Sequence, residues 1–235
     1  MWRNLLELLF PRACCGCGAR PCAGSFCTAC ASLVEVAPSW RCRICAGVAP
    51  PPAPGVRPSG LPLCPSCLRE PPPFSEVAAP FLYGGPVGDA IHRLKYRGRR
   101  EIAADLGALV ATSCRRLLAE AGAVAPIALH TGRRRERGYD QALLLARAIA
   151  RHAGRPLHPG LLRRIRSTPR QVGRDRAERL RNLAGAFEAA PTARGLVVAL
   201  VDDVVTTGAT AEAASRAVMD AGAARVVVLA VARVV

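Results

Sequence analysis

One stretch of the sequence decides the fold: Val197-Val198-Ala199-Leu200-Val201-Asp202-Asp203-Val204-Val205-Thr206-Thr207-Gly208-Ala209-Thr210. Its apolar run predicts a buried strand that ends at two adjacent carboxylates. The following turn opens a helix, whose first N–H groups and threonine hydroxyls form an anion cradle of phosphate size. The two acids before it suit ribose hydroxyls or Mg²⁺, so the run fits a ribose 5-phosphate. Either half alone would be read as an ordinary strand-to-helix turn with a threonine cap.

The segments around this stretch alternate between strand and helix patterns. The strands have continuous apolar runs, which are typical of strands buried on both faces. The sequence therefore predicts an α/β fold with a mainly parallel sheet covered by helices on both faces, and such sheets bind ligands at the carboxyl ends of their strands. Strands are predicted at residues 77–83, 124–129, 196–201 and 225–231, and helices at residues 86–96, 100–120, 139–153 and 211–221.

Ten of the eleven cysteines lie between Cys14 and Cys67. Two thiolates on one tight turn can bind the same tetrahedral Zn²⁺, so four such turns predict two structural zinc sites. Disulfides would need an oxidising compartment, and a redox pair would occur once rather than four times. The simplest pairing joins the first turn with the second and the third with the fourth, and an interleaved pairing stays open. The four turns are Cys14/Cys17, Cys27/Cys30, Cys42/Cys45 and Cys64/Cys67.

Proline-rich tracts divide the chain. Pro71-Pro72-Pro73 follows the last cysteine turn, which predicts a cysteine-rich region at residues 1–73 and an α/β domain at residues 74–235. The first eleven residues resemble a signal peptide only briefly, because Glu7 interrupts the apolar run and no small-residue cleavage site follows. The longest apolar runs are far below the roughly 20 residues of a membrane-spanning helix. We therefore expect a cytoplasmic protein without membrane insertion.

The chain of 235 residues has 33 Lys+Arg against 17 Asp+Glu, a formal net charge of +16. Lys95 is the only lysine, so the positive charge is almost all guanidinium, which favours anionic partners such as nucleic acid, a polyphosphate or an acidic protein. The sequence contains neither Gly-x-x-x-x-Gly-Lys-Ser/Thr nor Gly-x-Gly-x-x-Gly, which argues against an ATPase or a dinucleotide dehydrogenase.

Residues 202–210 resemble the phosphoribosyl-pyrophosphate (PRPP) loop of type I phosphoribosyltransferases. Three further features narrow the resemblance: residues 135–142, the arginine-rich run at 163–171 that leads to residues 178–182, and the cysteine-rich front. Together they resemble the ComF/GntX family of competence-associated, phosphoribosyltransferase-like proteins, which carry an N-terminal double zinc ribbon. The resemblance covers essentially the whole chain and implies a type I phosphoribosyltransferase fold behind a small zinc-ribbon region.

The resemblance also implies roles for individual residues. Asp202 and Asp203 would hold the ribose hydroxyls, and the 5′-phosphate would lie against Thr206, Thr207, Gly208, Ala209 and Thr210. The loop from His130 to Arg133 would stand where the family's pyrophosphate loop stands, and residues 163–181 would be a flap that closes over the site. The candidate catalytic residues are Asp202, Asp203, Arg133 and Arg164, with Lys95 as a further PRPP contact and Gln171 and Arg179 as flap candidates.

Two positions depart from the family pattern. The chain has Pro126-Ile127-Ala128 where a Pro-x-Pro run is expected, and Asp140 where Gly-aromatic-Asn-Gln would place an asparagine. An added carboxylate near a pyrophosphate is unfavourable unless an arginine or a metal offsets it. Both departures bear on turnover more than on fold.

Three functions are consistent with these features. The first is a Mg²⁺-dependent phosphoribosyltransferase, in which a nitrogen nucleophile displaces pyrophosphate from PRPP and which is linked to DNA uptake in natural transformation. The second is a non-catalytic competence factor that binds single-stranded DNA or DNA-uptake proteins, mainly through phosphate contacts because aromatic residues are only 4% of the chain. The third is a PRPP-responsive regulator. The expected cofactors are two structural zinc ions and, with PRPP, magnesium.

Overall fold

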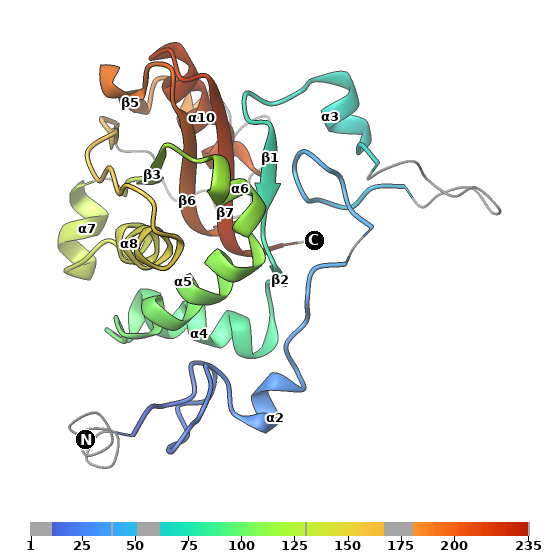
Figure 1. Cartoon of the computed structure of the whole chain (residues 1–235), viewed down its shortest axis with the longest axis vertical. Coiled ribbons are helices and arrows are strands. Elements are labelled where there is room, and N and C mark those ends of the chain that lie inside the picture. The colour runs from blue at the N-terminus through green and yellow to red at the C-terminus, as the bar shows by residue number, and fades with distance from the viewer. Residues whose placement is uncertain (1–10, 39, 51–61, 130, 167–180, 235) are drawn as a thin grey trace.

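The computed structural model describes residues 11–38, 40–50, 62–129, 131–166 and 181–234 (Figure 1). These residues form a five-stranded sheet in which β1-β7-β6-β3 are adjacent and β2 also pairs with β7. Every pairing in this sheet is parallel, and the central strands β6 and β7 run together from Val197↔Arg225 to Val205↔Arg233. The strands are β1 (Glu76–Ala78), β2 (Phe81–Leu82), β3 (Ala123–Pro126), β6 (Val197–Val205) and β7 (Arg225–Arg233).

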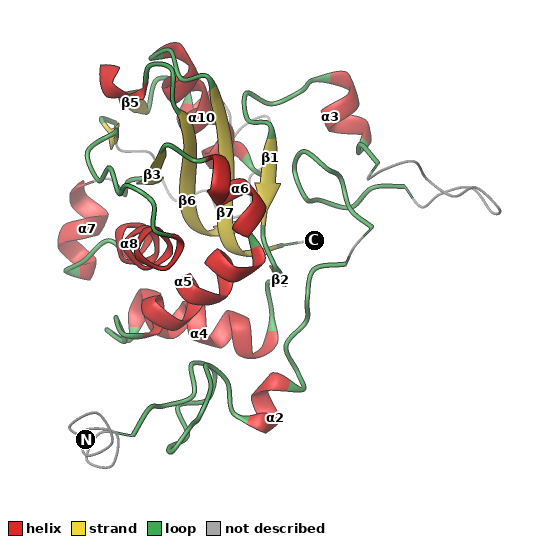
Figure 2. Ribbon diagram, viewed as in Figure 1, coloured by secondary structure: helices red, strands yellow, loops and turns green. Residues whose placement is uncertain are grey.

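Helices cover both faces of the sheet (Figure 2). Successive residues of β6 point to opposite cores: Ala199 and Val201 pack on one face and Val198 and Leu200 on the other. The first face carries α4 (Gly85–Tyr96), α5 (Ile102–Ser113), α6 (Arg115–Glu120) and α8 (Gln141–Ala153), and the second carries α10 (Ala209–Asp220). A small antiparallel sheet of β4 (Leu162–Arg164) and β5 (Phe187–Ala189) also packs on the second face. This double burial explains the continuous apolar runs.

The cysteine-rich part contains two short helices, α2 (Thr28–Ala31) and α3 (Pro65–Arg69), and lies along the β1–β2 edge of the sheet (Figure 1). The amide of Val77 in β1 donates to the Ile44 carbonyl at 2.6 Å, and the amide of Leu82 in β2 donates to the Glu35 carbonyl at 2.9 Å. At the opposite edge, Val124 of β3 exchanges backbone hydrogen bonds with residues 156 and 158. Both edges of the sheet are therefore covered by other parts of the same chain.

The structure confirms the parallel α/β sheet and corrects several boundaries. The strand expected at residues 77–83 is interrupted at residues 79–80 into β1 and β2, and the helix expected at residues 100–120 is divided at Cys114 into α5 and α6. Residues 131–133, expected in the loop from His130 to Arg133, belong to the helix α7 (Thr131–Arg137). Strand β6 continues to Val205, so both acids lie within the strand, because its pairing with β7 continues past them.

In the part of the chain that the structure describes, no helix combines the length and the apolar character needed to span a membrane.

The close contact between α5 and α8 depends on Gly107. A Cβ atom at this position would lie 2.4 Å from the Cβ of Ala148, far inside van der Waals contact. We predict that Gly107→Ala lowers the free energy of unfolding by about 1–3 kcal/mol, because the two helices must separate. Urea denaturation followed by circular dichroism measures this change.

Gly88 in the middle of α4 provides the matched control, since a Cβ there meets nothing within 4 Å. Gly88→Ala should leave stability unchanged or raise it by up to about 1 kcal/mol, because alanine favours the helix more than glycine does. Equal destabilisation by both substitutions would contradict the packing argument.

Candidate functional site

The carboxyl end of β6 holds a buried ion pair. Lys95, near the end of α4, places its Nζ 2.8 Å from Oδ1 of Asp203. The Asp203 side chain is only 5% exposed and that of Lys95 only 20% exposed. The second carboxylate oxygen of Asp203, Oδ2, is buried and has no hydrogen-bond partner among the described residues. A buried carboxylate oxygen needs a donor or a cation, so this atom is the strongest indication of a ligand at the site.

Asp202 lies beside this pair, and its Oδ1 accepts a hydrogen bond of 2.8 Å from the amide of Asp203. Burial, and then the neighbouring Asp203 carboxylate, raise the pKa of Asp202 to about 8. Burial alone would lower the pKa of Lys95, but the carboxylates of Asp203 and Asp202 outweigh it and raise that pKa above its usual value. The site therefore holds one ion pair, between Lys95 and Asp203, and one carboxyl group, that of Asp202, whose pKa lies near neutral pH.

The turn at residues 206–210 has the backbone expected of an anion cradle. Gly208 has φ +85, a left-handed conformation that L side chains rarely adopt, and it is the N-cap residue of α10. The Thr207 hydroxyl oxygen accepts a hydrogen bond from the amide of Ala209 at 3.5 Å. The first amides of α10 lack intrahelical acceptors, as in any α-helix, and point out of its N-terminus. The turn thus offers donors to an anion directly after the two acids.

Neighbouring residues hold this site in place. Asp140 is the N-cap of α8: its Oδ1 accepts from the amide of Leu143 at 3.1 Å, and its Oδ2 accepts from the amide of Leu129 at 3.3 Å. The Tyr139 hydroxyl donates to the carbonyl of Leu94, next to Lys95. The carboxylate that departs from the family pattern therefore has a structural role as a helix cap, and the tyrosine before it fixes the end of α4.

Eight cysteines form two groups that fit zinc. The first tetrad is Cys14, Cys17, Cys27 and Cys30, and the second tetrad is Cys42, Cys45, Cys64 and Cys67; within each, the sulfur atoms lie within 4.8 Å of one another. Cys17 and Cys27 have their Sγ atoms 3.8 Å apart, and Cys45 and Cys64 have theirs 3.7 Å apart. A tetrahedral zinc with Zn–S bonds of about 2.3 Å requires S–S separations of about 3.8 Å. The structure thus brings together all eight predicted ligands, in the simplest pairing.

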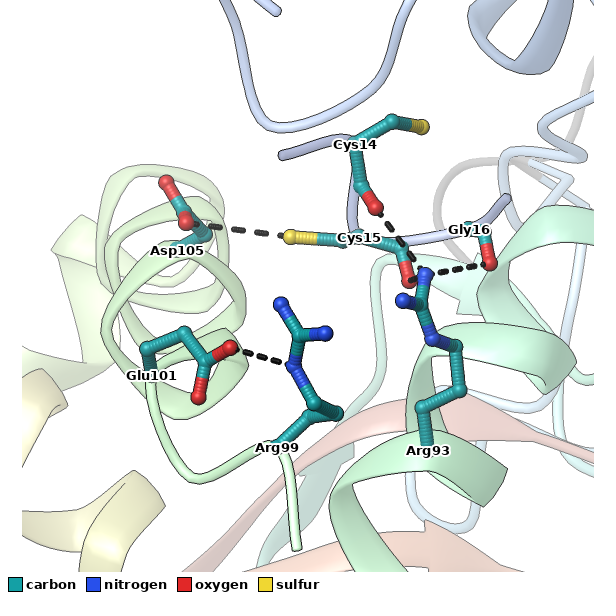
Figure 3. Close-up of polar contacts among 7 residues, drawn as sticks. All are labelled: Cys14, Cys15, Gly16, Arg93, Arg99, Glu101 and Asp105. Carbon is teal, nitrogen blue, oxygen red and sulfur yellow. Dashed lines mark hydrogen bonds and ion pairs between the residues drawn. The ribbon is translucent and has the colours of Figure 1, made fainter. Parts of the chain in front are cut away.

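An arginine of α4 anchors the first tetrad to the α/β domain (Figure 3). Nη1 of Arg93 lies 3.0–3.2 Å from the carbonyl oxygens of Cys14, Cys15 and Gly16 and donates to this group of acceptors. The thiol of Cys15, which is not in either tetrad, lies 3.7 Å from Oδ2 of Asp105 in α5. The metal site and the helix that carries Lys95 are therefore directly connected.

The structure describes the other predicted site residues only in part. Arg133 lies in α7, after β3, and its side chain is outside the described part; His130, Gln171 and Arg179 lie outside the described residues altogether. Arg164 ends β4, with its guanidinium carbon 5.4 Å from the ring centroid of Phe187. The structure thus assembles Asp202, Asp203, Lys95 and residues 206–210.

Sequence reasoning missed the positions of Tyr139 and Arg233 next to this site. The Arg233 guanidinium donates to the Thr206 carbonyl from the end of β7. An arginine that ends an apolar run is ordinary in sequence, and only the β6–β7 register brings it to the turn.

The tetrads make a direct prediction about metal content. The purified chain should contain two zinc ions, and Cys17→Ser or Cys45→Ser should each remove one, because a three-sulfur site binds zinc more weakly. Mass spectrometry of elemental zinc per chain measures this. Cys114→Ala is the control, since Cys114 lies outside both tetrads and should leave two ions. One zinc ion in the unmodified protein would contradict the assignment.

The raised pKa of Asp202 makes a second prediction. The folded state prefers the protonated acid, so stability from this group is present below the unfolded pKa of about 4 and is lost as the pH rises towards 8. Asp202→Asn removes this loss and keeps an acceptor for the amide of Asp203. The variant should gain about 1–2 kcal/mol over the wild type between pH 5.5 and pH 8, measured by urea denaturation.

The exposed Asp220, at the end of α10, provides the control for this pH dependence. Asp220→Asn should differ from the wild type by the same amount at both pH values. A gap between Asp202→Asn and the wild type that stays constant with pH would show that Asp202 is ionised throughout.

The chain is similar in sequence to several known proteins. No family model matches the chain. The DNA utilization protein YhgH of Salmonella typhi is 32% identical over 168 residues, which cover 69% of this chain and 74% of that protein. Competence protein F of Haemophilus influenzae is 30% identical over 178 residues, 72% of this chain and 78% of that protein.

Among solved structures, glutamine PRPP amidotransferase from B. subtilis, complexed with ADP and GMP, aligns with a TM-score of 0.39 at 20% identity. The alignment covers 60% of this chain and 30% of the enzyme, and a score this low carries no argument by itself. The assignment rests on the sequence relatives, on the helix-covered parallel sheet and on the two tetrads. The chain belongs to the ComF family and combines a helix-covered parallel sheet with two N-terminal cysteine tetrads suited to zinc.

Proposed function

We propose that this chain binds PRPP with Mg²⁺ at the carboxyl end of β6 and transfers the phosphoribosyl group with release of pyrophosphate. The observation that carries the proposal is the buried Asp203 carboxylate, of which Lys95 binds one oxygen while the other has no partner among the described residues. A donor from the ligand, such as a ribose hydroxyl, would satisfy that oxygen. The turn at residues 206–210 begins three residues later, so an acidic hydroxyl site and an anion site follow each other as a ribose 5-phosphate requires.

Each residue has a proposed task. Asp202 and Asp203 accept from the ribose hydroxyls, and Thr206, Thr207, Gly208, Ala209 and Thr210 hold the 5′-phosphate. Lys95 holds the Asp203 carboxylate in place through their ion pair, and Arg133 and Arg164 stabilise the charge that develops on the pyrophosphate. Magnesium, when bound, neutralises pyrophosphate charge.

In the proposed reaction the bond between the ribose C1 and the pyrophosphate oxygen breaks and a bond from an acceptor nitrogen to C1 forms. Pyrophosphate leaves with the bonding electron pair, and the acceptor nitrogen loses its proton. Catalysis would come mainly from positioning and electrostatics. The names of the relatives, competence protein and DNA utilization protein, support a role for this activity in DNA uptake or use.

A second candidate function is phosphate-mediated binding of single-stranded DNA. The chain carries a formal net charge of +16, and an open cavity of about 510 Å³ beside the first tetrad is lined by Arg93, Arg97 and Arg99 together with Asp89 and His92. Binding of single-stranded DNA to these arginines should weaken steeply as the salt concentration rises, because it depends on phosphate contacts. Arg97→Ala, an exposed position, should reduce DNA affinity in this case and leave PRPP binding unchanged.

Calorimetry with PRPP tests the first proposal. The zinc-loaded protein should bind PRPP saturably in the presence of Mg²⁺, and Asp202→Asn/Asp203→Asn should weaken binding at least about 100-fold, because two charge-assisted contacts of about 1.5–3 kcal/mol each are lost. Asp220→Asn serves as the control and should bind as the wild type does. Binding by the wild type then justifies a screen of nitrogen nucleophiles for pyrophosphate release.

The outcomes separate the candidates. Absence of PRPP binding by a folded, zinc-loaded wild type would overturn both the transferase and the PRPP-responsive regulator. Binding without pyrophosphate release from any nucleophile would favour the regulator. Binding that survives the double substitution would place the ligand elsewhere in the molecule.

A further inference from the structure

Arg233 is a buried charge that the proposed reaction does not use. It is the last residue of β7, is only 8% exposed, and lies opposite Val205 in the β6–β7 register. Burial lowers the pKa of its guanidinium, while the thiolates of the second tetrad act in the opposite direction. A buried cation needs a counter-charge or a full set of acceptors, so the groups around Arg233 determine where it stays.

One side of this guanidinium contacts the proposed phosphate turn. Nη1 donates to the carbonyl oxygen of Thr206, the first residue of the turn. This bond fixes the backbone immediately before Gly208, whose left-handed conformation orients the start of α10. The Nε atom is buried and has no hydrogen-bond partner within the described residues.

The other side of the guanidinium packs against Gly47, beside the second tetrad. Nη2 lies 3.0 Å from the position that a Cβ atom on Gly47 would occupy, and Sγ of Cys45 lies 3.3 Å from the same position. Gly47 follows the Cys42/Cys45 turn, and its missing side chain leaves room for the guanidinium. A cavity of about 290 Å³ is lined by Arg233, by Cys45, Cys64 and Cys67, and by Thr207 and Gly208 of the turn. The metal site and the turn therefore share one cavity wall.

The charge of a zinc-bound second tetrad would favour this position of the Arg233 guanidinium. Four thiolates around Zn²⁺ carry a net charge of −2, which attracts the guanidinium, and the metal would also hold the Cys42/Cys45 turn, with Gly47, in place beside Arg233. Glu212 also lines the cavity, but its carboxylate pairs with Arg216 at 3.6 Å. Zinc in the second tetrad thus keeps both a negative charge and a packing surface next to Arg233.

We propose that Arg233 is a positioning residue that couples zinc in the second tetrad to the shape of the turn at residues 206–210. With zinc bound, the negatively charged tetrad holds the guanidinium in place, and the guanidinium holds the Thr206 carbonyl. Without zinc, the Cys42/Cys45 turn no longer holds Gly47 against the guanidinium, which moves and releases that carbonyl. The inference deepens the proposed function, since it makes ligand binding at the turn depend on this tetrad and not on the first.

Hydrogen–deuterium exchange on the full chain tests the coupling without any ligand. The peptide covering residues 206–210 should exchange about 10-fold faster in Cys64→Ser/Cys67→Ser, which breaks the second tetrad, and in Arg233→Met, which keeps the cysteines. Cys27→Ser/Cys30→Ser, which breaks the first tetrad, is the matched control and should leave this peptide at the wild-type rate. Unchanged protection of residues 197–201 in β6 shows that the sheet is intact in every variant.

Combining the variants tests whether the two effects share one route. Adding Arg233→Met to Cys64→Ser/Cys67→Ser should give no further increase in exchange. If Arg233→Met does not fold, Arg233→Lys replaces it; this side chain keeps the charge but cannot reach both partners, and it should also speed exchange while zinc is retained. Wild-type exchange in a folded, zinc-loaded Arg233 variant, or equal acceleration when the first tetrad is broken, would overturn the coupling.

Calorimetry with PRPP and Mg²⁺ on the same variants connects the coupling to the ligand. Arg233→Met and Cys64→Ser/Cys67→Ser should each weaken binding about 10-fold, and the first-tetrad variant should not. If the wild type binds no PRPP, the proposed function fails, whereas the exchange rates still decide whether zinc and the turn are coupled through Arg233.

Discussion

The arrangement of the site depends on one buried charge, the carboxylate of Asp203 at the end of β6. Because β6 stays paired with β7 as far as Val205, Asp203 is carried into a buried position, and a buried carboxylate requires a cation. Lys95 is the only lysine of the chain, and α4 brings it to 2.8 Å from that carboxylate. The position of α4 therefore matters beyond packing, and Tyr139 and Arg93 each hold this helix through backbone carbonyls. The site is thus held by connected polar contacts, which run from Asp203 in β6 to Lys95 and the end of α4.

The two tetrads occupy a region with little core of its own. Among the described residues, the apolar cluster around the second tetrad contains, beyond the cysteines, Ala49 as its one buried residue, with Ile44 and Leu63 packed against it. Metal ligation supplies the cross-links that apolar burial does not provide in such a segment. An arginine of the α/β domain lies beside each tetrad: Arg93 donates to a backbone carbonyl of the first, and Arg233 lines one cavity with cysteines of the second. These arginines belong to α4 and to β7, so the two tetrads lie beside different elements of the domain, a covering helix and a sheet strand.

Most of the fold could be predicted from the sequence, because strands that are buried on both faces have continuous apolar runs. Strands β6 and β7 appear as continuous apolar runs, and the cysteine spacing predicted both tetrads. The errors arose where tertiary contacts overrule local pattern: the ladder with β7 extends β6 through two acids. Asp202, Asp203, Lys95 and the turn were found from local motifs and a family resemblance. The Lys95–Asp203 contact and the position of Arg233 depend on strand register, which short-range pattern does not contain.

The hydrogen bonds from Val77 to Ile44 and from Leu82 to Glu35 have a consequence for the behaviour of the protein in solution. They place the cysteine-rich segment over strands that would otherwise present unpaired amides and carbonyls at the margin of a parallel sheet. Such margins recruit strands from other molecules, which leads to aggregation. Zinc bound by the tetrads would therefore protect these strands from such pairing, because loss of the cysteine-rich segment from this edge would expose their backbone groups. Chelators in a purification buffer should be avoided for this reason, even where only the α/β domain is of interest.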